Sequence, residues 1–257
     1  MSTKVDINIS LENKIGIVEI TRPPNNHFDY KLISQIADCF EDFDKDKNCR
    51  CIVLCSEGKH FCAGANFGKD RDMQDKTDPY SELYKQAVRL FKNNKPVIAA
   101  VQGGAIGGGL GLSLIADFRI GCQESRFSAN FSRLGFHQGF GTTVTLPRVV
   151  GDQNAAMMML TGRRLKGQEA LDIGLIDYLV LKKEVRTKAI ELAEEISESG
   201  PLAVQSIRAT IRAGLADQVE EIVSKELSEQ MRLQSTNDFK EGINASLERR
   251  KPKFGGS

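Results

Sequence analysis

The amino-acid sequence predicts an α/β fold, and three observations lead to this prediction. Residues 96–101 form an apolar run that begins at Pro96, which is typical of a strand buried on both faces. A glycine-rich segment, 103–109, follows and leads into an apolar helix. Strand and helix patterns alternate before this run, whereas the pattern is helical throughout from Glu184 onward.

The N-terminal part is predicted to contain a β-hairpin, a helix and a strand. Apolar and polar residues alternate at 5–9, and the alternation resumes at 15–19 after a polar turn. Residues 29–43 place apolar side chains at spacings of three, four and seven, so we predict an amphipathic helix with Asp29 as its N-cap. Residues 51–55 have the composition of a buried strand.

The later elements alternate helices with short strands. We predict helices at 79–91, 140–150, 153–160 and 168–174, strands at 117–121 and 176–180, and a loop-rich segment at 126–141. The C-terminal helices have no obvious partner sheet, so we expect them to pack on the core and on another subunit. We place a boundary near Gly200, which divides the chain into a core at 1–200 and a helical region at 201–257.

Composition excludes several classes of function. The net charge is +1 and no aromatic-rich basic patch is present, which argues against nucleic-acid binding. No segment has the roughly 18 apolar residues needed to span a bilayer, and residues 1–9 lack a signal core, so we expect a cytoplasmic protein. The spacing of the six cysteines does not match common zinc patterns. We therefore predict no metal site and interpret the cysteines as buried reduced thiols.

Five glycines stand in seven residues at 103–109. The segment contains neither Gly-x-Gly-x-x-Gly nor a following Lys-Ser/Thr, so it does not match the nucleotide-binding patterns. A glycine-rich turn between a strand and a helix can present free amide groups to an anion such as a thioester oxyanion. The alternative interpretation is a turn that only permits tight packing.

The sequence resembles the enoyl-CoA hydratase/isomerase (crotonase) superfamily over nearly its whole length. The resemblance implies a spiral of ββα repeats with a C-terminal helical trimerisation region, assembly as a trimer or a dimer of trimers, and acyl-CoA thioesters as substrates without a bound cofactor. The matching segments are 61–66 (Phe-Cys-Ala-Gly-Ala-Asn), 96–101 with 107–109, 116–117, 160–162, 169–170, 174–176, 241–242 and 248–254.

The resemblance also implies roles for individual residues. In this family two backbone amides hold the thioester oxygen, and here they would belong to Ala65 and Gly108. The CoA moiety would lie along Ala63, Gly64 and Asn66, where Asn66 replaces the family's usual Asp. Arg249 stands where the family places a lysine near the CoA phosphates, and it would come from a neighbouring subunit.

Two departures from the family pattern concern the glutamates with which hydratases position and activate water. The first lies two residues after the third glycine, where this chain has Gly111. The second lies four residues after a phenylalanine that we align with Phe127, where this chain has Phe131. Neither residue can transfer a proton, so standard hydration is not expected.

Other polar residues could take over proton transfer. His137 is the first candidate because the reference pKa of imidazole, ~6.5, suits proton transfer near neutrality; the alternative is a structural histidine. We expect His60 to support its loop or face CoA, and His27 to be a loop residue. Further candidates are Asn130 and Ser132, as hydrogen-bond donors, and Asp72 and Asp75, which could fold over the site.

The leading hypothesis is an acyl-CoA enzyme that forms a thioester enolate and catalyses isomerisation, decarboxylation or C–C/thioester cleavage. One alternative is a hydratase with non-standard acid/base residues, and another is a non-catalytic acyl-CoA-binding protein. A dinucleotide-binding oxidoreductase is disfavoured because its glycine pattern is absent.

Overall fold

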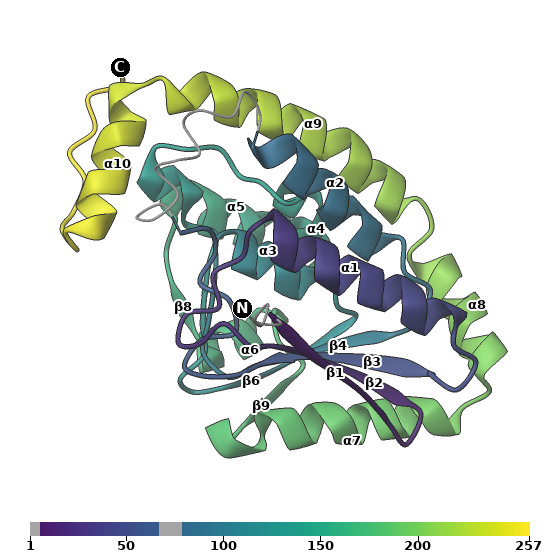
Figure 1. Ribbon diagram of the computed structural model, residues 1–257. Coiled ribbons are helices and arrows are strands. Elements are labelled where there is room, and N and C mark those ends of the chain that lie inside the picture. The colour runs from purple at the N-terminus through teal and green to yellow at the C-terminus, as the bar shows by residue number, and fades with distance from the viewer. Residues whose placement is uncertain (1–5, 67–78) are drawn as a thin grey trace, which may run out of the picture.

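A computed structural model describes residues 6–66 and 79–257 of the chain and shows two sheets with helices around them (Figure 1). The larger sheet has six strands in the order β1-β2-β3-β4-β6-β9. β1 is antiparallel to β2, and the other neighbouring pairs are parallel. Its strands are β1 (Ile7–Glu12), β2 (Ile15–Ile20), β3 (Cys51–Ser56), β4 (Val97–Val101), β6 (Phe118–Cys122) and β9 (Tyr178–Val180).

Both faces of the six-stranded sheet are covered, which explains the continuous apolar runs. Successive side chains of a strand point to opposite faces. In β3, Ile52 and Leu54 join the core that includes α1 (Tyr30–Lys45), whereas Val53 joins the core formed with α7 (Val185–Glu198). Figure 1 shows α1 and α7 on opposite sides of the sheet.

The helix predicted at 29–43 is confirmed, with its N-cap. The Asp29 carboxylate accepts a hydrogen bond of 2.9 Å from the backbone N–H of Leu32, so α1 begins where the sequence indicated. The next helix is α2 (Pro79–Phe91), which packs beside α1.

The smaller sheet consists of three short strands that the sequence did not reveal: β5 (Gly104–Ile106), β7 (Arg126–Ser128) and β8 (Leu165–Lys166). The prediction that 103–109 is entirely a turn was therefore wrong. Strands of two or three residues are too short for alternation to appear, and their pairing partners lie far away in the chain.

The helix predicted from Phe140 begins two residues later, as α4 (Thr142–Val150), because Phe140 and Gly141 have left-handed backbone angles (φ of 64° and 71°) that a right-handed helix cannot contain. The other central helices are α3 (Gly108–Leu114), η2 (Asn130–Leu134), α5 (Asp152–Thr161), α6 (Gly167–Asp172) and η3 (Lys182–Glu184).

The C-terminal helices differ in how they pack. α7 lies within the predicted core at 1–200 and covers one face of the six-stranded sheet. α9 (Leu215–Gln234) packs on α2 and α4, and α10 (Asn237–Leu247) turns back to contact η2. α8 (Pro201–Ile211) begins at the predicted boundary, although the division into two regions stays a prediction.

All six cysteines are buried and form no disulfide. Burial raises the pKa of the Cys62 thiol to about 12, so this residue beside the glycine-rich segment is no thiolate nucleophile near neutral pH. Within 6–66 and 79–257, three or more His, Cys, Asp and Glu side chains nowhere group as metal ligands would, and no helix is long and apolar enough to cross a membrane.

Candidate active site

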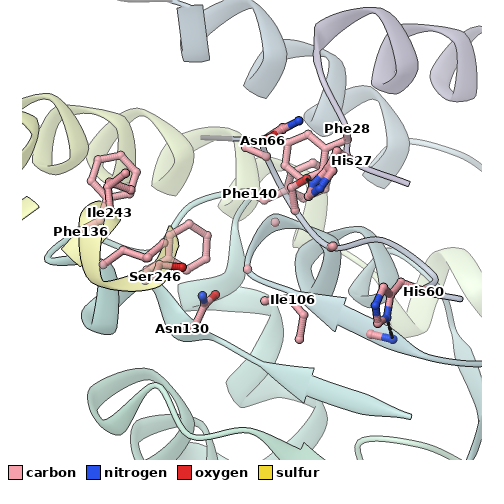
Figure 2. A pocket seen from close by; sticks show the side chains of 18 of the residues that line it. His27, Phe28, His60, Asn66, Ile106, Asn130, Phe136, Phe140, Ile243 and Ser246 are labelled. Carbon is pink, nitrogen blue, oxygen red and sulfur yellow. Dashed lines mark hydrogen bonds between the residues drawn. The ribbon is translucent and has the colours of Figure 1, made fainter. Parts of the chain in front are cut away.

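A cavity of about 440 Å³ opens where the loop after β3, the β5–α3 segment, η2 and α10 come together (Figure 2). It contains most of the residues that the sequence singled out. Its lining residues are His27, Phe28, His60, Ala63, Gly64, Ala65, Asn66, Leu83, Tyr84, Gly104, Ile106, Gly107, Gly108, Arg126, Asn130, Phe131, Leu134, Phe136, Phe140, Arg164, Gln230, Ile243, Ser246 and Leu247.

Two backbone segments far apart in sequence are joined at this cavity. The N–H of Cys62 donates to the Gly104 carbonyl at 2.9 Å, and the N–H of Ile106 donates to the Cys62 carbonyl at 3.0 Å. A Cβ at Gly103 would lie 2.0 Å from the Lys59 carbonyl oxygen, and one at Gly109 would lie 2.1 Å from that of Cys62. The glycines are therefore required for close approach between the two segments.

This contact places the amides of Ala65 and Gly108 in the same cavity. Within the described part of the chain, neither N–H donates a hydrogen bond. Gly64, with φ of +83°, is equally constrained, because a Cβ there would lie 2.8 Å from the Ile106 carbonyl oxygen and 3.9 Å from the Gly108 nitrogen. Two backbone N–H groups that line one cavity and donate no hydrogen bond can bind an oxyanion.

Two histidines line the cavity, and each forms one hydrogen bond with the backbone. Nδ1 of His27 lies 3.0 Å from the Gly64 carbonyl oxygen. Nδ1 of His60 accepts a hydrogen bond of 3.0 Å from the N–H of Gly104. Burial, with the nearby charges of Lys59 and Arg164, lowers the pKa of His60. His60 thus accepts a hydrogen bond from the glycine segment, and its lowered pKa favours the neutral ring.

His137, the predicted acid/base residue, is not among the residues that line this cavity. Its Nδ1 lies 3.0 Å from the carbonyl oxygen of Gln138, and its own carbonyl accepts from Gln230 on α9. Gln230 also accepts a hydrogen bond of 2.7 Å from the Tyr84 hydroxyl. The contacts of His137 are thus those of a residue that holds its loop to α9.

No carboxylate side chain of residues 6–66 and 79–257 lines the cavity. At Gly111, a Cβ would lie 2.8 Å from the Cβ of Phe140, so a glutamate could not be built there without moving that ring. Phe131 lines the cavity and stacks on Phe136, with ring centroids 6.4 Å apart. Gly111 and Phe131, which stand where the resemblance places the hydratase glutamates, therefore both lie against aromatic rings.

The other predicted residues fall into three groups. Asn130 lines the cavity together with the predicted CoA-contacting residues Ala63, Gly64 and Asn66. Ser132 and Arg249 do not line it; Arg249 is exposed, two residues after the lining residue Leu247. Asp72 and Asp75 lie outside the described residues.

An apolar wall closes the cavity on the side of α10. Phe131, Leu134 and Phe136 pack with Phe239 and Ile243, and Figure 2 shows Phe136, Ile243 and Ser246 close together. The sequence pattern gave no signal for this wall or for His27, because nothing local to either segment indicates that the two ends of the chain meet.

The chain is similar to known proteins over nearly its whole length. The family model for enoyl-CoA hydratase/isomerase matches residues 10–257. The chain is 30% identical over 255 residues to a probable enoyl-CoA hydratase of Bacillus subtilis, covering 97% of this chain and 98% of that protein. It is 31% identical over 255 residues to 1,2-epoxyphenylacetyl-CoA isomerase of Escherichia coli, covering 96% and 97%. The crystal structure of an enoyl-CoA hydratase/isomerase from Pseudoalteromonas atlantica matches with a TM-score of 0.88 at 27% identity, covering 98% of this chain and all of that one.

The fold and the amide-lined cavity define an enzyme with the crotonase fold. The chain belongs to the enoyl-CoA hydratase/isomerase family, so the predicted fold class and family are confirmed. Relatives named as a hydratase and as an isomerase are similarly distant from this chain, so the family does not by itself define the reaction.

Proposed function

We propose that the protein binds an acyl-CoA thioester, stabilises its enolate with the amides of Ala65 and Gly108, and does not hydrate enoyl-CoA by the two-carboxylate route. The reaction is an isomerisation, a decarboxylation or a C–C/thioester cleavage, and double-bond isomerisation is the form that needs the fewest groups. It requires one base that removes a proton from carbon and returns it to another carbon.

One observation carries this proposal. Among the described residues that line the cavity, the backbone N–H groups of Ala65 and Gly108 donate no hydrogen bond, and no side chain is a carboxylate. An oxyanion donor typically contributes ~3 kcal/mol of transition-state stabilisation, so the amide pair supports enolate formation. Water addition by the family's two glutamates has no counterpart here, since Gly111 and Phe131 occupy the expected positions.

The rest of the proposal concerns the ligand and the assembly. The pantetheine arm would lie along Ala63 to Asn66, Arg249 of a neighbouring subunit would meet the CoA phosphates, and no metal or further cofactor is needed. Trimer formation is supported by the exposed apolar side chains of α8, among them Leu202 and Ile211. Sedimentation analysis of the purified protein tests the oligomeric state.

Three thioesters test the reaction. With butyryl-CoA in D₂O, we expect deuterium to enter the α-carbon, because an enolate forms and is reprotonated from solvent. With 3-hexenoyl-CoA, we expect the 2-enoyl product. With crotonyl-CoA, we expect hydration at least about 100-fold slower than isomerisation, since general acid–base residues contribute roughly that factor.

Fast hydration of crotonyl-CoA would replace this proposal with a hydratase that uses non-standard acid/base residues. Thermal stabilisation by acyl-CoA without any exchange or turnover would instead identify a non-catalytic acyl-CoA-binding protein.

A further inference from the structure

The side chain of Asn130 is a polar group of the cavity wall, beside the amide of Gly108. We infer that its carboxamide donates a hydrogen bond to a second oxygen of the substrate, so that the site selects acyl-CoAs with a carbonyl or carboxylate oxygen on C3. The inference rests on the proposed enolate chemistry and names the substrate class of the same site.

The smaller sheet places Asn130 beside the glycine segment. β5 and β7 run parallel with Ile106 opposite Ser128, and the N–H of Gly107 donates to the Ser128 carbonyl at 2.8 Å. Both strands end at this pair, and Gly108 and Asn130 each follow it by two residues. The two residues therefore lie at the carboxyl ends of neighbouring parallel strands, and both line the cavity.

The backbone of Gly107 shows on which side of the Gly108 amide the carboxamide lies. At the Gly107 ψ of −122°, a Cβ on this residue would eclipse the Gly108 nitrogen about the Cα–C bond. In a trans peptide the N–H of Gly108 points to the side of the Gly107 Cα, so this N–H and the Cβ position face the same space. Oδ1 of Asn130 lies 3.2 Å from that Cβ position.

This geometry limits the distance between the carboxamide and a bound oxyanion. With standard bond lengths, an oxygen about 2.9 Å from the Gly108 nitrogen along its N–H lies at most roughly 6 Å from Oδ1 of Asn130. That span accommodates a second oxygen that lies about 3 Å from the first, as in a 1,3-dicarbonyl group, and accepts a hydrogen bond of about 2.9 Å from the carboxamide. Of the reactions proposed above, decarboxylation and C–C cleavage act on acyl groups of this type.

The Asn130 side chain is available to a ligand. It makes no hydrogen bond within residues 6–66 and 79–257, it is half-buried, and Figure 2 shows it pointing from η2 into the cavity. By contrast, the Tyr84 hydroxyl donates to Gln230, and Nδ1 of His27 and of His60 each bond to the backbone. A carboxamide can donate through Nδ2 and accept through Oδ1, so rotation about its last bond presents the donor.

The charges of the cavity wall suit an acyl group with a second oxygen. Among the described lining residues no side chain is a carboxylate, and the two permanently charged ones, Arg126 and Arg164, are positive. A carboxylate or an enolate of the substrate therefore meets no like charge from these residues. An oxygen that leaves water for this cavity needs a hydrogen-bond donor, and Asn130 supplies one.

Two thioesters of equal chain length test the inference in the wild-type protein. Acetoacetyl-CoA has an oxygen on C3, whereas butyryl-CoA has none. We expect acetoacetyl-CoA to bind about tenfold more tightly in isothermal titration calorimetry, because one added hydrogen bond typically contributes that factor. Malonyl-CoA distinguishes the two oxygen types, since tighter binding than that of acetoacetyl-CoA identifies a carboxylate site and weaker binding a ketone site.

Variants of Asn130 test whether the preference comes from its carboxamide. Asn130→Asp keeps the shape but has no Nδ2 donor, and Asn130→Ala lacks the whole group. We expect both variants to lose the preference for a C3 oxygen, while their affinity for butyryl-CoA stays within about twofold of the wild-type value. Ser132→Ala is the matched control, because Ser132 lies on the same η2 helix but does not line the cavity, so this variant should keep the preference.

Three results would overturn the inference. In the first, neither acetoacetyl-CoA nor malonyl-CoA binds the wild-type protein more tightly than butyryl-CoA. In the second, Asn130→Ala weakens all three ligands equally, which would make the carboxamide a further donor to the thioester oxygen. In the third, Ser132→Ala loses the preference as fully as Asn130→Ala, which would mean that disturbance of η2 accounts for the loss.

Deuterium exchange of butyryl-CoA separates this inference from the proposed function. Absence of exchange together with an intact preference for a C3 oxygen overturns the enolate chemistry and supports a binding site for oxygenated acyl groups. Exchange without that preference supports the enolate chemistry and overturns the role of Asn130.

Discussion

The cavity has two walls that are built in different ways. One wall consists of main chain, where the segment of Lys59 to Ala65 is paired with that of Gly103 to Gly109 through backbone hydrogen bonds and glycine contacts. The other consists of side chains from η2 and α10, which form an apolar cluster around Phe131 and Phe136. The first wall holds the two amides proposed to bind the thioester oxygen, and the second forms an apolar surface.

In the proposed function, the main-chain wall would determine the chemistry, and the side-chain wall would determine which acyl groups are accepted. Backbone amide groups cannot be altered by substitution, so the proposed anion site depends on which positions permit close approach of the backbone. The apolar wall can change residue by residue without loss of the amide pair.

The strongest way to break the main-chain wall is Gly109→Ala. Its Cβ would lie 2.1 Å from the Cys62 carbonyl oxygen, which belongs to the backbone and cannot move aside. We expect a loss of about 3 kcal/mol or more in the free energy of unfolding, measured by urea denaturation, together with loss of α-proton exchange.

Gly200→Ala is the matched control, since its Cβ would meet Ala203 only at 3.9 Å and its φ is −61°. It should stay within about 0.5 kcal/mol of the wild-type stability. Equal effects of the two changes would show that close approach does not explain Gly109.

A more selective change to the same wall is Gly64→Ala. The new Cβ would lie 2.8 Å from the Ile106 carbonyl oxygen, so the Gly64–Ala65 peptide must rotate. We expect kcat for isomerisation to fall 10²-fold or more, since one misdirected oxyanion donor costs roughly that much. Stopped-flow turnover with 3-hexenoyl-CoA measures this effect.

Gly174→Ala shares the left-handed backbone (φ of +73°) but has open space, with its nearest atom 3.9 Å away. It reports the cost of the conformation alone, ~1–2 kcal/mol of stability. If its kcat fell as far as that of Gly64→Ala, general strain would account for the loss.

The side-chain wall can be tested with Gly242→Ala on α10. A Cβ there would lie 2.4 Å from the carbonyl carbon of Leu134, so α10 must move away from η2. We expect KM for medium-chain acyl-CoA to rise about tenfold while kcat changes less, because the amide pair is untouched. A kcat loss as large as that of Gly64→Ala would mean that the two walls are not independent.

The smallest effect concerns the N-terminal loop that supports the main-chain wall. Arg22 pairs with Asp6 at 2.8 Å and donates to the His27 carbonyl at 3.3 Å. The hydrogen bond from Arg22, helped by Lys31, lowers the pKa of Asp6 from 3.8 to about 2. A carboxylate with a lowered folded-state pKa stabilises the fold above pH 4, and this stability is lost as the pH falls towards 2.

Urea denaturation across this pH range measures the effect. Asp6→Asn should remove part of the pH dependence, whereas Glu12→Gln on the exposed end of β1 should leave it unchanged. An identical pH profile for Asp6→Asn and the wild-type protein would contradict the role of this pair.

The main-chain wall was predictable, because its requirements appear as glycines and small residues at fixed spacing. The two amides were assigned to Ala65 and Gly108 from the resemblance to the crotonase superfamily, and both residues line the same cavity. The six-stranded sheet was largely predictable too, since strands buried on both faces leave apolar runs such as 97–101.

The side-chain wall and the histidines were not predictable for a physical reason. Phe136 and Ile243 meet only after the chain has folded, and no periodicity connects residues a hundred positions apart. His27 and His137 are both loop histidines in sequence; the hydrogen bond to Gly64 and the cavity beside it distinguish them.

The position of α10 has a consequence for how the protein matures during synthesis. The cavity joins His27 and Phe28, which leave the ribosome early, to Ile243 and Leu247, which leave it much later. A nascent chain can assemble the six-stranded sheet long before its apolar wall exists. Acyl-CoA should therefore stabilise finished chains and give little protection to chains cut before α10, so limited proteolysis with and without ligand would distinguish the two populations.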